Sequence, residues 1–132
     1  MRREFTLPSE DMEWLEERGL PYELVGAGGT LRVVLYDLPV PPGYNVSSVT
    51  AYVRIEPGYP ESQIDMVYFL PDLALVDGRP IGAISVDNFD GKTWQRWSRH
   101  RTPINPWRPG IDNLGTHFAQ VQVWLERETK KA

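Results

Sequence analysis

Cysteine is absent from the 132 residues of this sequence. A chain without cysteine forms no disulfide, offers no thiolate nucleophile and provides no sulfur ligand for zinc. Histidine is also scarce, because His100 and His117 are the only two. Two histidines with neither cysteine nor a spaced carboxylate motif are poor evidence for a metal centre. We therefore expect no metal site and no other cofactor.

The sequence also lacks an excess of positive charge and any long apolar run. Its net charge of -4 argues against a general nucleic-acid binder, because such domains are usually basic. No apolar run approaches the roughly 20 residues that span a bilayer. Residues 1–8 lack the apolar centre of a signal peptide. We therefore expect a cytoplasmic protein with no membrane partner.

The length and composition favour a single domain over residues 1–132. Hydrophobic residues make up 41% and charged residues 24%, values typical of a folded globular chain. A chain of this length can bury one core. No internal repeat, low-complexity segment or linker divides it.

Helical patterns lie near both ends of the chain. Ser9 is the expected N-cap of a short helix over residues 10–18, and Gly19 is the expected left-handed residue after its end. A second amphipathic helix is expected over residues 112–127. The apolar residues that define this helix recur at helical spacing: Leu114, Phe118, Val121 and Leu125.

Strand-like segments fill the region between these helices. The expected strands cover residues 22–25, 31–36, 49–55 and 66–70. A glycine-rich hairpin loop joins the first two, and residues 37–43 are expected to form a loop because prolines cannot donate to a strand ladder. Residues 81–86 show a weaker extended pattern. This order predicts a two-layer α+β domain with a four-stranded antiparallel meander, followed by an irregular segment and the C-terminal helix.

The expected irregular segment, residues 91–114, is the most unusual stretch of the sequence. It contains Trp94, Trp97, Trp107, Arg96, Arg99, Arg101, Arg108 and His100. Tryptophan and arginine stack well, so one interpretation is a lid over the core. The other is a binding surface, since a guanidinium binds a carboxylate or a phosphate through two hydrogen bonds.

Several motifs resemble the ubiquitin-conjugating (UBC-like) enzyme family. Residues 56–60 (EPGYP) resemble the proline–tyrosine–proline turn of that family, and residues 66–71 (MVYFLP) resemble the strand after it. The stretch WQRWSRH at 94–100, followed by WRPGIDNL at 107–114, is similar to the signature of a prokaryotic branch. The resemblance covers nearly the whole chain and implies the UBC-like fold.

The resemblance also implies a function and partners. Members of this branch are encoded beside ubiquitin-like proteins, adenylating activating enzymes and metal-dependent deconjugating peptidases. This neighbourhood implies protein conjugation in bacterial antiviral defence. The wider family carries the ubiquitin-like protein as a thioester on cysteine, which this chain lacks. Three alternatives stay open: an oxyester on a serine, catalysis without a covalent intermediate, or a non-catalytic binding module.

Ser98 and His100 are the first candidates for the chemistry. A serine hydroxyl needs a general base, and histidine suits that role near neutral pH. Residues two apart share a face in an extended chain but not in a helix, so this pair requires a non-helical segment over 97–101. The alternative is that Ser98 caps a turn and His100 is a structural donor.

Ser85 is the second candidate acceptor. Residues 84–87 (ISVD) can be laid over the run that contains the catalytic cysteine of the family, and this resemblance sets Ser85 at that position. An exposed strand serine explains the same residues. His117 is expected on the flank of the last helix. A small single-stranded nucleic-acid binder, with stacked tryptophans and paired arginines, is a third class of function that the acidic net charge disfavours.

Overall fold

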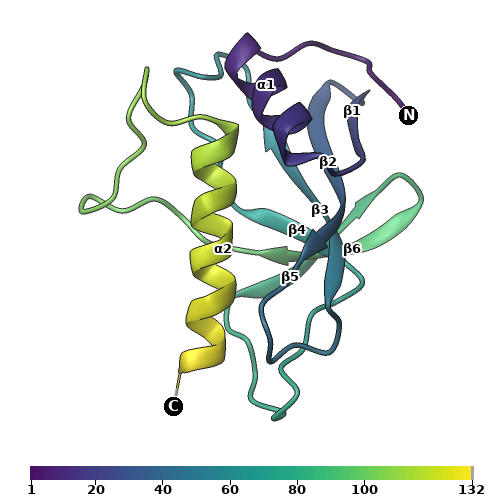
Figure 1. Cartoon of the computed structure of the whole chain (residues 1–132), viewed down its shortest axis with the longest axis vertical. Coiled ribbons are helices and arrows are strands. Elements are labelled where there is room, and N and C mark those ends of the chain that lie inside the picture. The colour runs from purple at the N-terminus through teal and green to yellow at the C-terminus, as the bar shows by residue number, and fades with distance from the viewer. Residues whose placement is uncertain (132) are drawn as a thin grey trace.

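Residues 1–131 are described by a computed structural model, in which both helices pack on one face of a six-stranded antiparallel sheet (Figure 1). The elements in chain order are α1 (Ser9–Arg18), β1 (Tyr22–Ala27), β2 (Thr30–Pro39), β3 (Ser48–Ile55), β4 (Val67–Leu70), β5 (Ile84–Phe89), β6 (Lys92–Trp97) and α2 (Leu114–Lys130). The strand order across the sheet is β1-β2-β3-β4-β6-β5. The expected α+β class and the four-stranded meander are confirmed.

The two helices follow the predicted pattern with changes at their ends. Gly19 has φ of 74° and its N–H donates to Leu15 O, as expected at the end of α1. Ser9 is not the N-cap, because it is the first helical residue and Pro8 precedes it without a side-chain cap. Helix α2 begins after Asn113, whose side chain accepts from Thr116 N–H at 3.1 Å. It then continues past the predicted end to Lys130.

The sheet is larger than the sequence suggested. Residues 92–97 form strand β6, so the first part of the expected irregular segment is regular. A two-residue turn at Asp90 and Gly91, both with positive φ, joins β5 to β6. This Asp-Gly pair is a strong hairpin signal. Strand β2 also extends to Pro39 through an irregularity after Leu35, so the loop predicted over 37–43 starts later.

Side chains are buried on both faces of the sheet. The helix-covered face holds the main core, in which Trp97 is fully buried and lies edge-on to Phe69. The opposite face carries a second cluster in which Tyr52 and Tyr68 stack with ring centroids 4.3 Å apart. Trp94 belongs to this second cluster and is 3% exposed. For Trp94 and Trp97 the structure therefore favours the core interpretation over a surface binding role.

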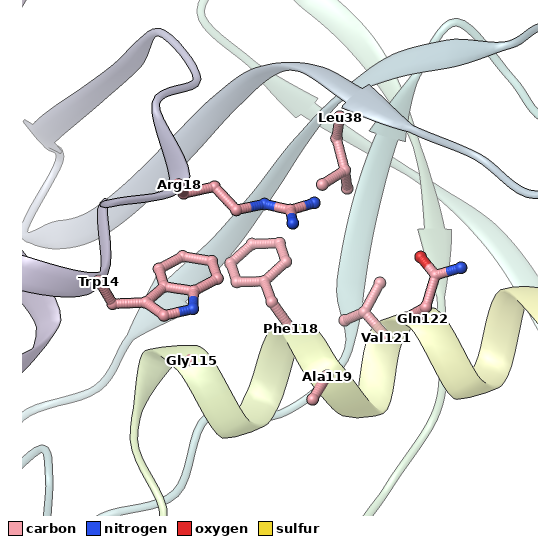
Figure 2. Close-up of a pocket in the computed structure, with 8 residues that line it drawn as sticks. All are labelled: Trp14, Arg18, Leu38, Gly115, Phe118, Ala119, Val121 and Gln122. Atoms are coloured by element: carbon pink, nitrogen blue, oxygen red, sulfur yellow. The ribbon is translucent and has the colours of Figure 1, made fainter. Parts of the chain in front are cut away.

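Trp14 joins α1 to α2 beside a small pocket of about 300 Å³. Its indole stacks on the ring of Phe118, with centroids 5.5 Å apart (Figure 2). The close approach depends on Gly115, because a Cβ there would lie 2.9 Å from Trp14 Cδ1. Helix α2 therefore needs a glycine in its first turn for packing, although glycine is a weak helix former.

We expect Gly115→Ala to lower the free energy of unfolding by about 1–3 kcal/mol, the usual range for overpacking. Helix propensity alone predicts that the alanine would raise the free energy of unfolding by about 1 kcal/mol. Urea unfolding measures the difference. Gly82→Ala is the matched control, because its added Cβ meets nothing within 4 Å. Equal or higher stability of Gly115→Ala would contradict the packing of Trp14 on α2.

Candidate functional site

The linking segment, residues 98–113, joins the end of β6 to the start of α2. At its beginning, Met66 N–H donates to Arg99 O at 3.2 Å. Further along, Trp107 Nε1 donates to Pro60 O at 3.0 Å, and its indole lies beside the ring of Tyr59. The segment is therefore fixed to the start of β4 and to the Tyr-Pro turn.

Asp65 holds the imidazole of His100 at the surface of the linking segment. The Nδ1 atom of His100 lies 2.9 and 3.0 Å from the two carboxylate oxygens of Asp65. The two side chains are 57% and 32% exposed. With its proton on Nδ1, the ring donates to Asp65 and leaves Nε2 free to accept a proton, as a general base requires. Nothing in the local sequence around Asp65 marks it as a partner of His100.

Ser98 lies two residues before His100, and residues 97–101 are not helical. Ser98 N–H donates to Ala83 O at 3.0 Å and continues the β5–β6 ladder by one residue. Alternation along that strand puts Ser98 on the face of Arg96. The condition for a Ser98–His100 pair is therefore met, but within residues 1–131 no hydrogen bond joins the two side chains.

Ser85 lies on β5 and already has a partner. Its Oγ accepts a hydrogen bond from Arg96 Nε at 2.7 Å. The serine is half-buried and directly opposite Arg96 in the sheet. No histidine contacts this hydroxyl among the described residues, so the structure gives Ser85 no general base.

Three of the four arginines from the unusual stretch are paired with carboxylates. Arg99 binds Glu128 at 3.0 Å, and Arg108 binds Asp112 at 3.3 Å. Arg101 lies 3.9 Å from Asp112 and stacks over the ring of Trp107. Burial opposes ionisation of Asp112, but hydrogen bonds from Arg108 and the charge of Arg101 keep its pKa below the ordinary value. Arg99 therefore holds the linking segment to α2, while Arg101 and Arg108 bind Asp112 within the segment itself.

His117 is in the interior rather than on a flank of α2, which corrects the expectation. It is 1% exposed and its Nε2 lies 2.8 Å from Met66 O, while Nδ1 is buried without a partner. Burial lowers its pKa to about 4. The helical spacing indicates this burial, because His117 is three residues after Leu114 and one before Phe118, on the same apolar stripe.

No group of three or more His, Asp or Glu side chains in the described part of the chain is arranged to hold a metal ion. No helix in that part is long and apolar enough to cross a membrane. The two histidines have separate partners, Asp65 for His100 and Met66 O for His117.

The model of prokaryotic E2 family E matches residues 7–128. The chain belongs to that family. The match covers the fold, the Tyr-Pro turn and the linking segment together, which agrees with the UBC-like architecture expected from the sequence. No curated protein and no solved structure matches the chain.

Membership of prokaryotic E2 family E gives the chain a role in a ubiquitin-like conjugation pathway. Its general partners in such a pathway are a ubiquitin-like protein and an activating enzyme. Within the family fold, the exposed His100–Asp65 pair is the one histidine–carboxylate contact in the described residues. It is therefore the part of the linking segment best suited to proton transfer.

The buried His117 predicts a pH dependence of stability. Its pKa is about 4 in the folded chain against 6.5 for the ordinary group, so the unfolded chain binds more protons between these values. The contribution is present in full above pH 6.5 and is lost as the pH falls from there to 4. We expect a loss of about 3 kcal/mol of unfolding free energy from this group.

Urea unfolding of wild type and His117→Gln at several pH values tests this expectation. The glutamine does not titrate in this range, so the variant should show a flatter profile between pH 6.5 and 4. His100→Gln is the control, because it removes a histidine but retains the buried His117, so its stability should still fall between pH 6.5 and 4. Parallel profiles for wild type and His117→Gln would contradict the assignment.

Proposed function

We propose that the chain performs the transfer step of its conjugation pathway, with Ser98 as acceptor, His100 as general base and Asp65 as the residue that orients the base. The observation that supports this proposal is the His100–Asp65 contact at 2.9 Å, which occupies Nδ1 and leaves Nε2 without a protein partner on a half-exposed ring two residues after Ser98. A carboxylate on Nδ1 sets the tautomer of a catalytic histidine in serine hydrolases in the same way.

The first half of the reaction forms an ester. Ser98 Oγ attacks the carbonyl carbon of the activated C-terminus of the ubiquitin-like protein, and His100 Nε2 takes the hydroxyl proton. The bond from that carbon to the leaving group on the activating enzyme, an adenylate or a thiolate, then breaks. The imidazolium releases its proton to the leaving group or to water, which restores neutral His100 for the second half. The product is an oxyester, because the chain has no cysteine to form a thioester.

The second half transfers the C-terminus to an amine. The amine nitrogen attacks the ester carbon and the ester bond to Ser98 Oγ breaks. The amine loses its proton to His100, and the imidazolium returns a proton to the serine oxygen. The general-base step is worth roughly 10²–10⁴-fold in rate. The proposal includes a cytoplasmic location, a deconjugating peptidase as a further partner and a part in antiviral defence.

A binding module of the same fold is the second candidate function. The observation in its favour is that both candidate hydroxyls lack a general base at hydrogen-bond distance: no described hydrogen bond joins Ser98 to His100, and Ser85 accepts from Arg96. Hydrogen bonds in catalytic sites often tighten only when the substrate binds, so the catalytic candidate is tested first. A module would hold the ubiquitin-like protein without any covalent step.

The test is an adduct assay with the activating enzyme, ATP and the ubiquitin-like partner, read on a reducing gel. We expect an adduct that survives thiol reductants and is cleaved by hydroxylamine or base. It should be absent in Ser98→Ala and should form at least 10²-fold more slowly in His100→Gln, because the general base is lost. Ser9→Ala is the matched control, since that exposed serine makes no cap bond.

Each other result favours a different interpretation. An adduct that persists in Ser98→Ala and disappears in Ser85→Ala would make Ser85 the acceptor. Conjugation that requires the folded protein without any adduct would support the binding module. Binding to an oligonucleotide but to neither pathway partner would contradict both functions and favour the nucleic-acid class.

A further inference from the structure

Three arginines gather on the sheet face opposite the helices, near the end of the sheet where Ser98 lies. Arg32 on β2 is directly opposite Arg54 on β3, and Arg96 on β6 is directly opposite Tyr68 on β4. Like charges in directly opposed strand positions destabilise a sheet unless something neutralises them. Arg32 and Arg54 both lie outside the tryptophan- and arginine-rich stretch at residues 91–114.

Only one carboxylate in the described part of the chain, that of Asp87, forms an ion pair with any of these three guanidinium groups. Asp87 binds Arg54 at 3.1 Å and accepts from the hydroxyl of Tyr52. Among residues 1–131, neither Arg32 nor Arg96 forms an ion pair with any acidic side chain. The cluster therefore carries an excess of two positive charges in a chain whose net charge is -4.

Two of the guanidinium groups also have buried donors without a partner. Arg32 is 9% exposed, and its Nε is buried with no hydrogen bond. Its charged group stacks over the ring of Phe89 at 4.2 Å. Arg54 Nε is likewise buried and unpartnered. A buried donor left without an acceptor costs about 1–3 kcal/mol, more when it is charged, so such groups usually have a partner.

The rest of the cluster presents further donors around Tyr68. The guanidinium of Arg54 lies 5.0 Å from the centre of that ring. Burial raises the pKa of Tyr68, while the charges of Arg54 and Arg96 act in the opposite direction and that of Asp87 adds to the rise. Ser85 Oγ accepts from Arg96, which leaves the serine proton free to donate. The side chain of Arg54 is 31% exposed, so solutes can reach it.

The charge excess is confined to this end of the sheet face. At the other end, Arg2 binds both Glu23 and Asp90 at 2.8 Å, and Lys92 lies 4.0 Å from Asp90. That group has two cations and two carboxylates, so it is balanced. The arginine-rich end has the donors and the charge of an anion site, whereas the opposite end has neither in excess.

We propose that Arg54 and Arg96, with Arg32 beside them, bind an oxyanion of the carboxylate or phosphate class. Guanidinium groups bind both kinds of anion through paired, charge-assisted hydrogen bonds. An anion here would offset the opposed charges of Arg32 and Arg54 by binding the part of the guanidinium cluster that solvent reaches. The ligand is either a peptide C-terminal carboxylate or a phosphate group.

Binding is measured on the isolated protein with inorganic phosphate, N-acetylglycine and its uncharged amide, all against sodium chloride at equal ionic strength. The readouts are the arginine Nε–Hε signals in ¹⁵N NMR spectra and the thermal midpoint. We expect saturable shifts of the Arg54 and Arg96 signals and a rise in midpoint with phosphate, N-acetylglycine or both, but not with the amide. The anion that saturates at lower concentration identifies the source.

Arg96→Gln should abolish the saturable shift and the rise in midpoint. The matched control is Arg127→Gln, an exposed arginine on α2 that should retain both effects. Equal shifts with chloride, or unchanged binding in Arg96→Gln, would overturn the proposal and leave the arginines as packing residues. The assay needs no pathway partner, so its outcome is independent of Ser98 chemistry.

Discussion

The carboxylate of Asp11 is the contact on which the arrangement of this fold depends. It is 2% exposed and accepts from Tyr59 Oη at 2.6 Å and from Leu114 N at 3.2 Å. One side chain thereby connects α1, the Tyr-Pro turn and the first turn of α2, whose leading N–H groups need acceptors. Burial is the main cause of its raised pKa, and the two hydrogen bonds oppose that rise. The same turn also positions the linking segment, because Trp107 packs against Tyr59.

Local patterns were enough to predict most of the fold. The apolar stripe of α2 and the alternation of β3 each place apolar side chains on one face. That face must be buried, so the structure contains both elements as predicted. Local patterns did not predict the elements whose structure depends on tertiary contacts. β6 places Trp94 and Trp97 on opposite faces, and both faces are covered, so its sequence shows no simple alternation. Ser9 looks like a cap, but the helix begins one residue earlier, after Pro8.

The candidate site was predictable only in part, for a related reason. Ser98, His100 and Arg99 are near one another in the sequence, so a local search finds them. Asp65 lies two residues before β4, the strand that neighbours β6, and nothing in its local sequence connects it with His100. Arg32 and Arg54 are ordinary residues of alternating strands until the sheet sets them opposite each other. Charged residues that become neighbours only through strand pairing cannot be recognised as a cluster from the local sequence.

The arginines illustrate why an unusual composition is a weak guide to a binding surface. Those concentrated in the linking segment have carboxylates nearby: Glu128 for Arg99, and Asp112 for Arg101 and Arg108. Both acids are buried, and a buried carboxylate needs a cation or hydrogen-bond donors close to it. The Arg99 pair therefore fixes the segment to α2, and the two pairs with Asp112 fix the segment internally; together they leave little charge free for a ligand.

The same anchoring bears on the chemistry that the chain can perform. The linking segment is held at Arg99 by Met66 and at Trp107 by Pro60, on either side of His100. Ser98 is held by its own ladder bond to Ala83. With the backbone fixed at these points, a Ser98–His100 contact depends on side-chain rotation, which takes picoseconds to nanoseconds at exposed positions. The imidazole would have to keep its Asp65 contact through Nδ1 while Nε2 turns toward the serine, so Asp65 decides which nitrogen faces the acceptor.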